Sequence, residues 1–496
     1  MGFTTDSFDR RGWALGPVRA SFVVWTAVLV GSILGFLVSV DALVLHWIPD
    51  ELLDVQRQIP FALTFLLVVA IAVASAFANF RRRLFARRFD VTLVGIMVAV
   101  SVSGIGGTLE TTDVALPLAL LLWLFAAIVE QRPIRVPLPA LILALLFAIG
   151  CVGSIVNLGS MAISSLVSPA KMLLLAFLVA DLIDGQHRCR LAIRWFVLLA
   201  VILAAVALFT GILDTAAGVS MTAWDDAKFQ AKETPFGKLM RATAFLPTAQ
   251  VLAHFLILGV ALLLPFPVRP IWKVLGVLLL SVGILWTLSS GAYLLLALTL
   301  LAWLFLRRPE RSIHYAVILI GLVVLGYMVG VSDWLWNNGL SDLGSDPAQD
   351  RVVQMRNSVS AIAQHPVLGA GVSAWIRSPG GSVHVHNSFL EAASEVGIPA
   401  TLVLIGMLLS LVIAAAILIT RLPDGEDRDR CKGVLLGTIA LMIHWNAEPF
   451  LFCAVSWLFI GIGTGVVTHY GRELRRAKDR MGSTPAPTAN PGRPAG

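Results

Sequence analysis

The sequence is poor in charge: lysine, arginine, aspartate and glutamate make up only 14% of its 496 residues. A soluble domain has about a quarter of its residues charged, so this composition excludes an ordinary globular enzyme and a disordered chain. Hydrophobic residues supply 57% of the chain. Since each membrane-spanning helix needs about 20 apolar residues, we expect a membrane protein with about ten or more spans.

Several motifs are also missing. The four cysteines, Cys151, Cys189, Cys431 and Cys453, show no CxxC spacing, so neither a disulfide framework nor a zinc site is predicted. No Walker A motif and no GxGxxG before a helix occur, which argues against an ATP-driven transporter. No repeat relates the two halves, which weakens an inverted-repeat transporter. No small-residue cleavage site follows the first apolar run, so we expect that run to remain as a span.

Fourteen apolar segments are candidates for these spans. The segments 274–289 and 291–306 are each short but together too long for one span, so a tight hairpin at Ser289-Ser290-Gly291 is predicted between them. The complete set is 20–42, 60–80, 90–107, 113–130, 137–157, 166–184, 195–214, 247–265, 274–289, 291–306, 313–331, 397–420, 432–447 and 449–468.

Lysine and arginine gather in every second loop, which predicts that these loops and both termini are cytoplasmic. The basic segments are 81–88, 131–136, 185–194, 269–273, 307–311, 421–432 and the tail after Arg472. The predicted fold class is therefore an all-α polytopic membrane protein of about 14 transmembrane helices with a partly helical external loop domain. The predicted regions are a cytoplasmic N-terminus (1–19), transmembrane helices (20–216), an external loop (217–246), further transmembrane helices (247–332), a large external loop with the active site (333–396), C-terminal transmembrane helices (397–470) and a disordered tail (471–496).

The two external loops carry basic residues against the preference for positive charge inside. An anionic ligand at the outer membrane boundary would explain them, because guanidinium groups pair well with phosphate oxygens. The alternative is solvated loop charge paired with Asp342, Asp346 and Asp350. The longer loop also has a helical apolar pattern from Val352 to Leu368, which indicates an ordered segment.

Four motifs resemble the O-antigen ligase/polymerase superfamily of bacterial membrane glycosyltransferases. HNSFLEAASEVG at 386–397 is similar to the family pattern HNxxLxxxxExG, which enters a membrane helix. RVVQM at 351–355 and HPVLGAG at 365–371 match the arginine that opens a helix and the turn that follows it. RATAFLPT at 241–248 resembles the family's entry to an earlier span. The resemblance covers roughly residues 235–470.

This resemblance implies a fold of the GT-C class and an inverting, metal-independent transfer without a cofactor. The implied donor is a glycan on undecaprenyl diphosphate at the extracytoplasmic face of the bacterial inner membrane. The implied acceptor is lipid A-core for a ligase, a second lipid-linked glycan for a polymerase, or a protein. Membrane lipids and polysaccharide assembly proteins are the other candidate partners, and no nucleic acid is expected.

One family motif is incomplete. Where the family commonly has an arginine in the hairpin motif Ser-Arg-Gly-Ala, this chain has Ser290. The missing residue would be one cationic contact to phosphate, and Lys228, Lys232 and Lys238 are the candidates to replace it.

His386 is the predicted catalytic base, since imidazole can accept a proton from a sugar hydroxyl at neutral pH. The alternative is a histidine that only hydrogen-bonds its loop. Glu395 is expected to pair with an arginine or to orient His386, because an unpaired carboxylate beside an apolar span is costly. His384 and His386 have no third ligand at suitable spacing, so no metal site is predicted.

Arg241 and Arg351 are predicted to hold the diphosphate leaving group and to stabilise the charge that develops on it. Arg356 and Asn387 complete the predicted substrate-binding set. For Arg351 the alternative is a salt bridge at the start of its helix. Either Asn387 or Ser388 could cap the helix that follows, and Ser388-x-x-Glu391 has the spacing of a capping box.

Glu448, with His444 and Asn446, lies at the outer end of a predicted span, where an ionisable group indicates either a functional site or a buried hydrogen-bonded network. We do not include it among the predicted catalytic residues. Transporters place polar groups at the middle of the bilayer, whereas here they concentrate in external loops and helix ends. That distribution favours a glycosyltransferase over a lipid-linked oligosaccharide flippase or a structural subunit.

Overall fold

The computed structural model describes residues 89–102, 111–129, 138–153, 162–217, 231–234, 237–307, 346–372 and 385–482. The predicted spans at 20–42, 60–80 and 313–331 lie outside the described residues, so the number of fourteen spans stays a prediction. Every other predicted segment is occupied by a helix.

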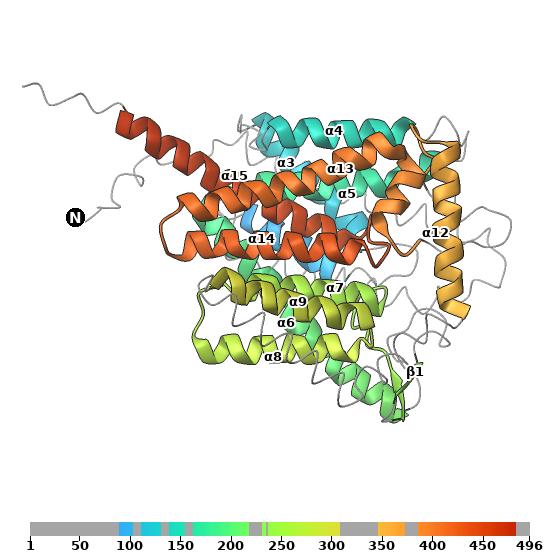
Figure 1. Cartoon of the computed structure of the whole chain (residues 1–496). Helices are drawn as coiled ribbons and strands as arrows, with labels where there is room; N and C mark the ends of the chain where they lie inside the picture. Colours follow the sequence, from blue (N-terminus) through green and yellow to red (C-terminus); the bar gives the residue numbers. More distant parts are fainter. Residues whose placement is uncertain are drawn as a thin grey trace, which may run out of the picture. The chain divides into compact units, whose positions relative to one another are not determined.

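The described chain is helical apart from one short hairpin (Figure 1). A helix at Phe89–Ser101 comes first. It is followed by α3 (Thr111–Val129), α4 (Leu138–Gly153), α5 (Ala162–Leu182), α6 (Gln186–Ala217), β1 (Ala231–Thr234), β2 (Gly237–Met240), α7 (Ala249–Leu263), α8 (Pro270–Trp286), α9 (Ser290–Arg307), α12 (Asp346–Gln364), α13 (Ser388–Arg421), α14 (Glu426–Trp445) and α15 (Ala454–Gly482). The hairpin predicted around Ser289 is confirmed, because α8 ends at Trp286 and α9 begins at Ser290.

The structure corrects the sequence-based prediction at two places. The strands β1 and β2 pair antiparallel, with Ala231 opposite Met240, so one short hairpin interrupts the otherwise all-helical fold. Each strand has only four residues and no alternation of apolar side chains, which leaves no sequence signal. The tail predicted to be disordered from residue 471 is helical through Gly482, because α15 continues into a run of good helix formers.

The helix α7 lies at the centre of the packing, against α6, α8, α9 and α14 (Figure 1). Nearly all its side chains are buried, as expected for a helix that is apolar on every side. Small residues let its neighbours approach closely: a Cβ atom on Gly259 would lie 2.6 Å from the Cβ atom of Ala200 on α6. Helix α7 therefore contacts helices from both the middle and the C-terminal part of the described chain.

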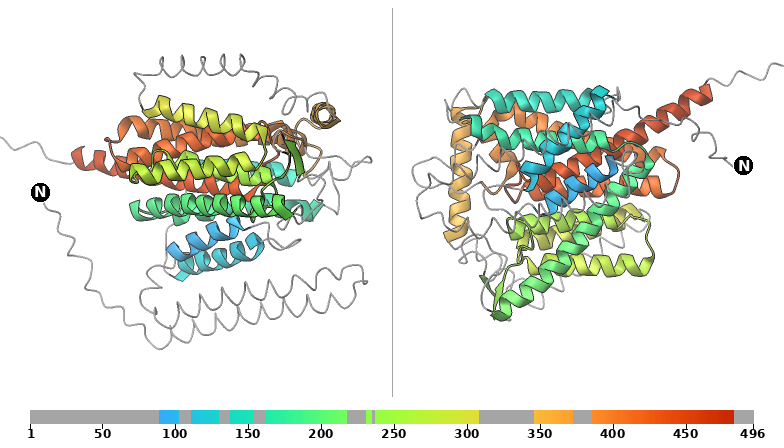
Figure 2. Two further views of the ribbon diagram at one scale, coloured as in Figure 1. Left: turned by 90° about the horizontal axis from the view of Figure 1, so that it is seen from below. Right: turned by 180° about the vertical axis from the view of Figure 1, so that it is seen from behind.

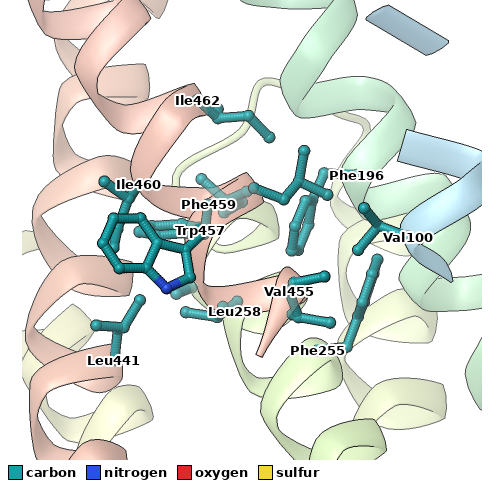
Figure 3. Close-up of a cluster of buried hydrophobic side chains, with 14 of the residues drawn as sticks. Val100, Phe196, Phe255, Leu258, Leu441, Val455, Trp457, Phe459, Ile460 and Ile462 are labelled. Atoms are coloured by element: carbon teal, nitrogen blue, oxygen red, sulfur yellow. The ribbon is translucent and has the colours of Figure 1, made fainter. Parts of the chain in front are cut away.

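Aromatic side chains fill the space between α6, α7 and α15 (Figure 3). Phe196 stacks on Phe255 with ring centroids 4.5 Å apart and planes at 11°. Phe459 meets Phe196 edge to face at 6.3 Å. These rings are fully buried, and such contacts add to the stabilisation that comes from apolar burial.

Several helices present apolar side chains outward. Along α13, Leu402, Leu409, Ile413 and Ile417 form an exposed stripe that extends over about 23 Å at 1.5 Å per residue. Two helices, at Gln186–Ile212 and Ser388–Arg421, are long and apolar enough to cross a membrane, and five shorter apolar helices accompany them in the described part of the chain. The fold and its outward apolar stripes fit a membrane protein.

At one end of α6, α14 and α15, a buried arginine forms a network of ion pairs and hydrogen bonds. The side chain of Arg430, at the start of α14, is fully buried and contacts Glu426, Asp427 and the hydroxyl of Tyr470 on α15. Arg190 on α6 reaches Glu426 at 2.8 Å. A buried guanidinium needs such partners, because burying a charge without them is costly. This network fixes α6, α14 and α15 at the end where α13 finishes.

Candidate active site

His386 and Glu448 lie together where α13 begins and α14 ends, away from the Arg430 network. His386 lies just before α13, and Glu448 lies in the turn that joins α14 to α15. The Nδ1 atom of His386 is 3.2 Å from the Oε2 atom of Glu448. The His386 side chain is 22% exposed and that of Glu448 is 10% exposed, so the pair is mostly shielded and His386 is the more accessible of the two.

Asn387 and Ser388 fix this turn against the start of α13. Asn387 is the N-cap of α13: its side-chain oxygen accepts from the backbone N–H groups of Phe389 and Leu390, both at 3.0 Å. Its amide nitrogen donates to the carbonyl of Asn446 at 3.2 Å. Both ends of the Asn387 side chain are therefore engaged in structure, and its predicted contact with substrate stays a prediction.

Ser388 forms hydrogen bonds to the backbone of the turn that contains Glu448. Its hydroxyl donates to the carbonyl of Glu448 and accepts from the backbone N–H of Phe450, each at 2.7 Å. The capping-box interpretation of Ser388 and Glu391 is wrong, because Asn387 is the cap and Ser388 already belongs to the helix. The sequence pattern misleads here because the Ser388 hydroxyl bonds a distant turn instead of its own helix.

The helix α13 is broken at Gly397, and the HPVLGAG segment crosses it there. Gly397 has φ 86°, which an L-residue with a side chain rarely adopts. A Cβ atom on Gly397 would lie 2.1 Å from the carbonyl oxygen of Val367, and one on Gly369 would lie 2.2 Å from that of Glu395. Backbone bonds from Ala370 to the Ser394 carbonyl (2.7 Å) and from Gly371 to the Glu395 carbonyl (3.0 Å) join the two segments.

The same crossing docks α12 onto α13, and α12 runs across the ends of the other helices (Figure 1, Figure 2). The helix predicted from the apolar pattern at Val352–Leu368 is thus present at Asp346–Gln364. Arg351 lies in its second turn, and the structure describes its backbone only. Arg356 lies one to two turns further on, with an exposed side chain. Their predicted contacts with phosphate stay predictions.

Arg241 approaches the His386 pair from the segment between β2 and α7. Its Nε atom donates to the carbonyl of Thr287 at 2.9 Å, which ties it to the turn between α8 and α9. Burial lowers the pKa of the Arg241 guanidinium, while the charges of Glu448 and Tyr293 act in the opposite direction. The charge of Glu448 therefore acts on Arg241, and the same carboxylate bonds His386.

The carboxylate that bonds the Nδ1 atom of His386 is that of Glu448. The Glu395 side chain is buried on α13, where it interacts electrostatically with Cys151 of α4. The expectation that Glu395 pairs with an arginine or orients His386 stays a prediction, as does its catalytic role. The signal for Glu448 was its position at an outer helix end beside His444 and Asn446.

The candidate replacements for the absent hairpin arginine cannot be placed against this site. Lys228 lies outside the described residues. Lys232 and Lys238 lie in β1 and β2, for which the structure describes the backbone only, as it does for Ser290 in α9. Since β2 ends at Met240, the hairpin leads directly into Arg241.

Residues 275–405 match the family described as O-antigen ligase. The resemblance to the O-antigen ligase/polymerase superfamily is thereby confirmed. The matched residues make up about a quarter of the chain and include His386, whereas Arg241 and Glu448 lie outside them.

No curated protein matches the sequence. A solved chain from a study of polymerization and crosslinking by a peptidoglycan synthase complex aligns with 66% of this chain and 97% of its own length. The sequence identity is 19% and the TM-score is 0.39.

Proposed function

We propose that the protein transfers a glycan from an undecaprenyl-diphosphate carrier to an acceptor hydroxyl at the extracytoplasmic face of the bacterial inner membrane. The observation that carries this proposal is the contact of His386 with Glu448 at one end of the helices, together with the electrostatic influence of Glu448 on Arg241. A base, a carboxylate to hold it and a cation for a leaving group are the parts that a metal-independent glycosyl transfer needs.

His386 acts as the general base in this proposal. Its Nδ1 atom faces Glu448, which leaves Nε2 to accept the proton of the acceptor hydroxyl. The oxygen of that hydroxyl forms a bond to the anomeric carbon, and the bond from that carbon to the phosphate oxygen breaks with its electron pair. Attack from the side opposite the leaving group inverts the anomeric configuration. Glu448 stabilises the imidazolium that results.

Arg241 stabilises the negative charge that grows on the diphosphate as the bond breaks. Its guanidinium is largely buried, and charge pairs act more strongly where water is excluded. The carbonyl of Thr287 holds its Nε atom, which fixes the direction of the side chain. Arg351 and Arg356 on α12 are the candidates for further phosphate contacts.

The membrane orientation is part of the proposal. Fourteen spans in a GT-C-type fold, with both termini in the cytoplasm, place the Arg190–Glu426–Arg430 network on the cytoplasmic side. His386 and Glu448 lie at the other ends of α13 and α14. This orientation agrees with the preference of basic residues for the cytoplasmic side.

The test is glycan transfer by the purified protein with a lipid-linked donor and three acceptors in separate reactions: lipid A-core, a second lipid-linked glycan and a protein. His386→Ala should reduce transfer ~100- to 1,000-fold, as expected for loss of a general base, without loss of donor binding. His187→Ala is the matched control, since His187 is an exposed histidine at the opposite end of the helices. Wild-type activity in His386→Ala would refute the assignment. Movement of the donor across proteoliposome membranes without any transfer would favour a flippase instead.

A further inference from the structure

A chain of polar side chains is buried directly behind the Glu448 turn. The Nδ1 atoms of His254 on α7 and His444 on α14 lie 2.9 Å apart. The Nε2 atom of His254 is 3.0 Å from the hydroxyl of Ser456 on α15. The indole nitrogen of Trp445 reaches the same hydroxyl at 3.1 Å. All four residues are at most 1% exposed, so water does not supply these bonds.

The indole of Trp445 is a donor only, so the Ser456 hydroxyl accepts from it. That hydroxyl has a second lone pair and a proton of its own, so it can either accept from or donate to Nε2 of His254. Between Nδ1 of His254 and Nδ1 of His444, one nitrogen carries the proton and the other accepts it. Both directions link the same residues, and Nε2 of His444 has no hydrogen-bond partner among the described residues.

The chain joins the two flanks of the turn that carries Glu448. His444 lies in the last turn of α14, and its carbonyl accepts the backbone N–H of Glu448 at 3.0 Å. Ser456 lies in the first turn of α15, on the other side. His254 contacts both residues from α7. The ring of Phe450, inside the turn, lies 4.8 Å from the rings of both histidines.

This arrangement does more than satisfy buried polar groups. An apolar residue at position 254 would fill the same space, yet the chain places an imidazole there with a partner on each ring nitrogen. A fully connected buried polar network specifies a unique geometry, because each misaligned member loses a bond in a dry environment. The geometry specified here is that of residues 446–453, and Glu448 is the residue of that turn that reaches His386.

We propose that His254 is a positioning residue: by linking His444 to Ser456 it holds the 446–453 turn so that the Glu448 carboxylate stays against His386. This inference rests on the proposed glycosyl transfer for its kinetic consequence. His254 does not touch the substrate and acts only through Glu448.

The experiment compares two variants of His254. His254→Leu fills the space without hydrogen bonds, whereas the side-chain amide of His254→Asn can donate to or accept from Nδ1 of His444. Thr438→Val is the matched control, because it removes a buried hydroxyl from α14 that bonds only within that helix. We expect kcat for glycan transfer to fall ~10- to 100-fold in His254→Leu, with KM for the donor within about twofold, because a misplaced catalytic group affects the chemical step. His254→Asn should recover most of the loss, and Thr438→Val should resemble the wild type.

A kcat of His254→Leu within about twofold of wild type, or no recovery in His254→Asn, would overturn the inference. If His254→Leu is not obtained folded, Ser456→Ala takes its place, since it breaks the same link with a smaller change in volume. Amide hydrogen exchange separates this inference from the proposed function. If the wild type transfers no glycan, faster exchange over residues 446–453 in His254→Leu than in Thr438→Val still supports the positioning role. Equal exchange in the two variants contradicts it.

Discussion

Replacement of Glu448 by glutamine tests the proposed role of the carboxylate beside His386. The change keeps the size of the side chain and an oxygen that can accept a hydrogen bond, and it removes only the charge. At the 3.2 Å between Nδ1 of His386 and Oε2 of Glu448, a full ionic interaction is worth about 5 kcal/mol at an effective dielectric constant of about 20. This is the gross stabilisation available to the imidazolium.

The net loss in Glu448→Gln is smaller. Solvent reaches 22% of the His386 side chain and 10% of Glu448, and the glutamine oxygen retains a neutral hydrogen bond. We therefore expect a loss of about 2 kcal/mol, which corresponds to a ~30-fold fall in kcat. KM for the donor should stay the same or decrease, because glutamine removes a negative charge near the position proposed for the diphosphate beside Arg241.

The assay is glycan transfer at saturating donor and acceptor, with Glu473→Gln as the control. Glu473 undergoes the same chemical change on α15, where its side chain is 50% exposed and pairs with the exposed Arg476. A kcat within about threefold of wild type would refute the idea that Glu448 stabilises the charged imidazole. A loss that comes entirely from a higher KM would refute it as well.

Two further predictions concern the glycine crossing and Arg241. In thermal unfolding in detergent, Gly397→Ala should destabilise the fold by about 2–4 kcal/mol, because the φ of this residue is positive and the new Cβ atom would overlap the Val367 carbonyl. The control is Gly406→Ala, in open space on the same helix, which should be neutral or slightly stabilising. Arg241→Lys should bind undecaprenyl diphosphate near neutral pH and lose it at alkaline pH at which the wild type still binds. The burial that lowers the pKa of Arg241 would also lower that of a lysine, whose ordinary pKa is already below that of arginine. Equal pH dependence of binding in both proteins would contradict this.

The apolar helices were predictable because composition and loop charge constrain them strongly. The tight turn before Ser290 was also visible, since serine and glycine interrupt an otherwise continuous apolar run. The β hairpin was not, because the pairing of Ala231 with Met240 comes from backbone bonds between strands too short to show a period.

The candidate site was predictable only in part. His386 and Arg241 follow from motifs that resemble a family, and the charge of Glu448 acts on both. Glu448 was not among the predicted catalytic residues, because it lies outside those motifs and far along the chain from His386. Contact across 62 residues depends on how α13 and α14 pack, which no local pattern records.

The separation of His386 from Glu448 has a consequence for biosynthesis. The whole of α13 and of α14 lies between His386 and Glu448 in the sequence, so both helices are synthesised before Glu448. A nascent or truncated chain that ends before this turn has the His386 imidazole without the Glu448 carboxylate. In the proposed mechanism, such a chain lacks the group that stabilises the imidazolium.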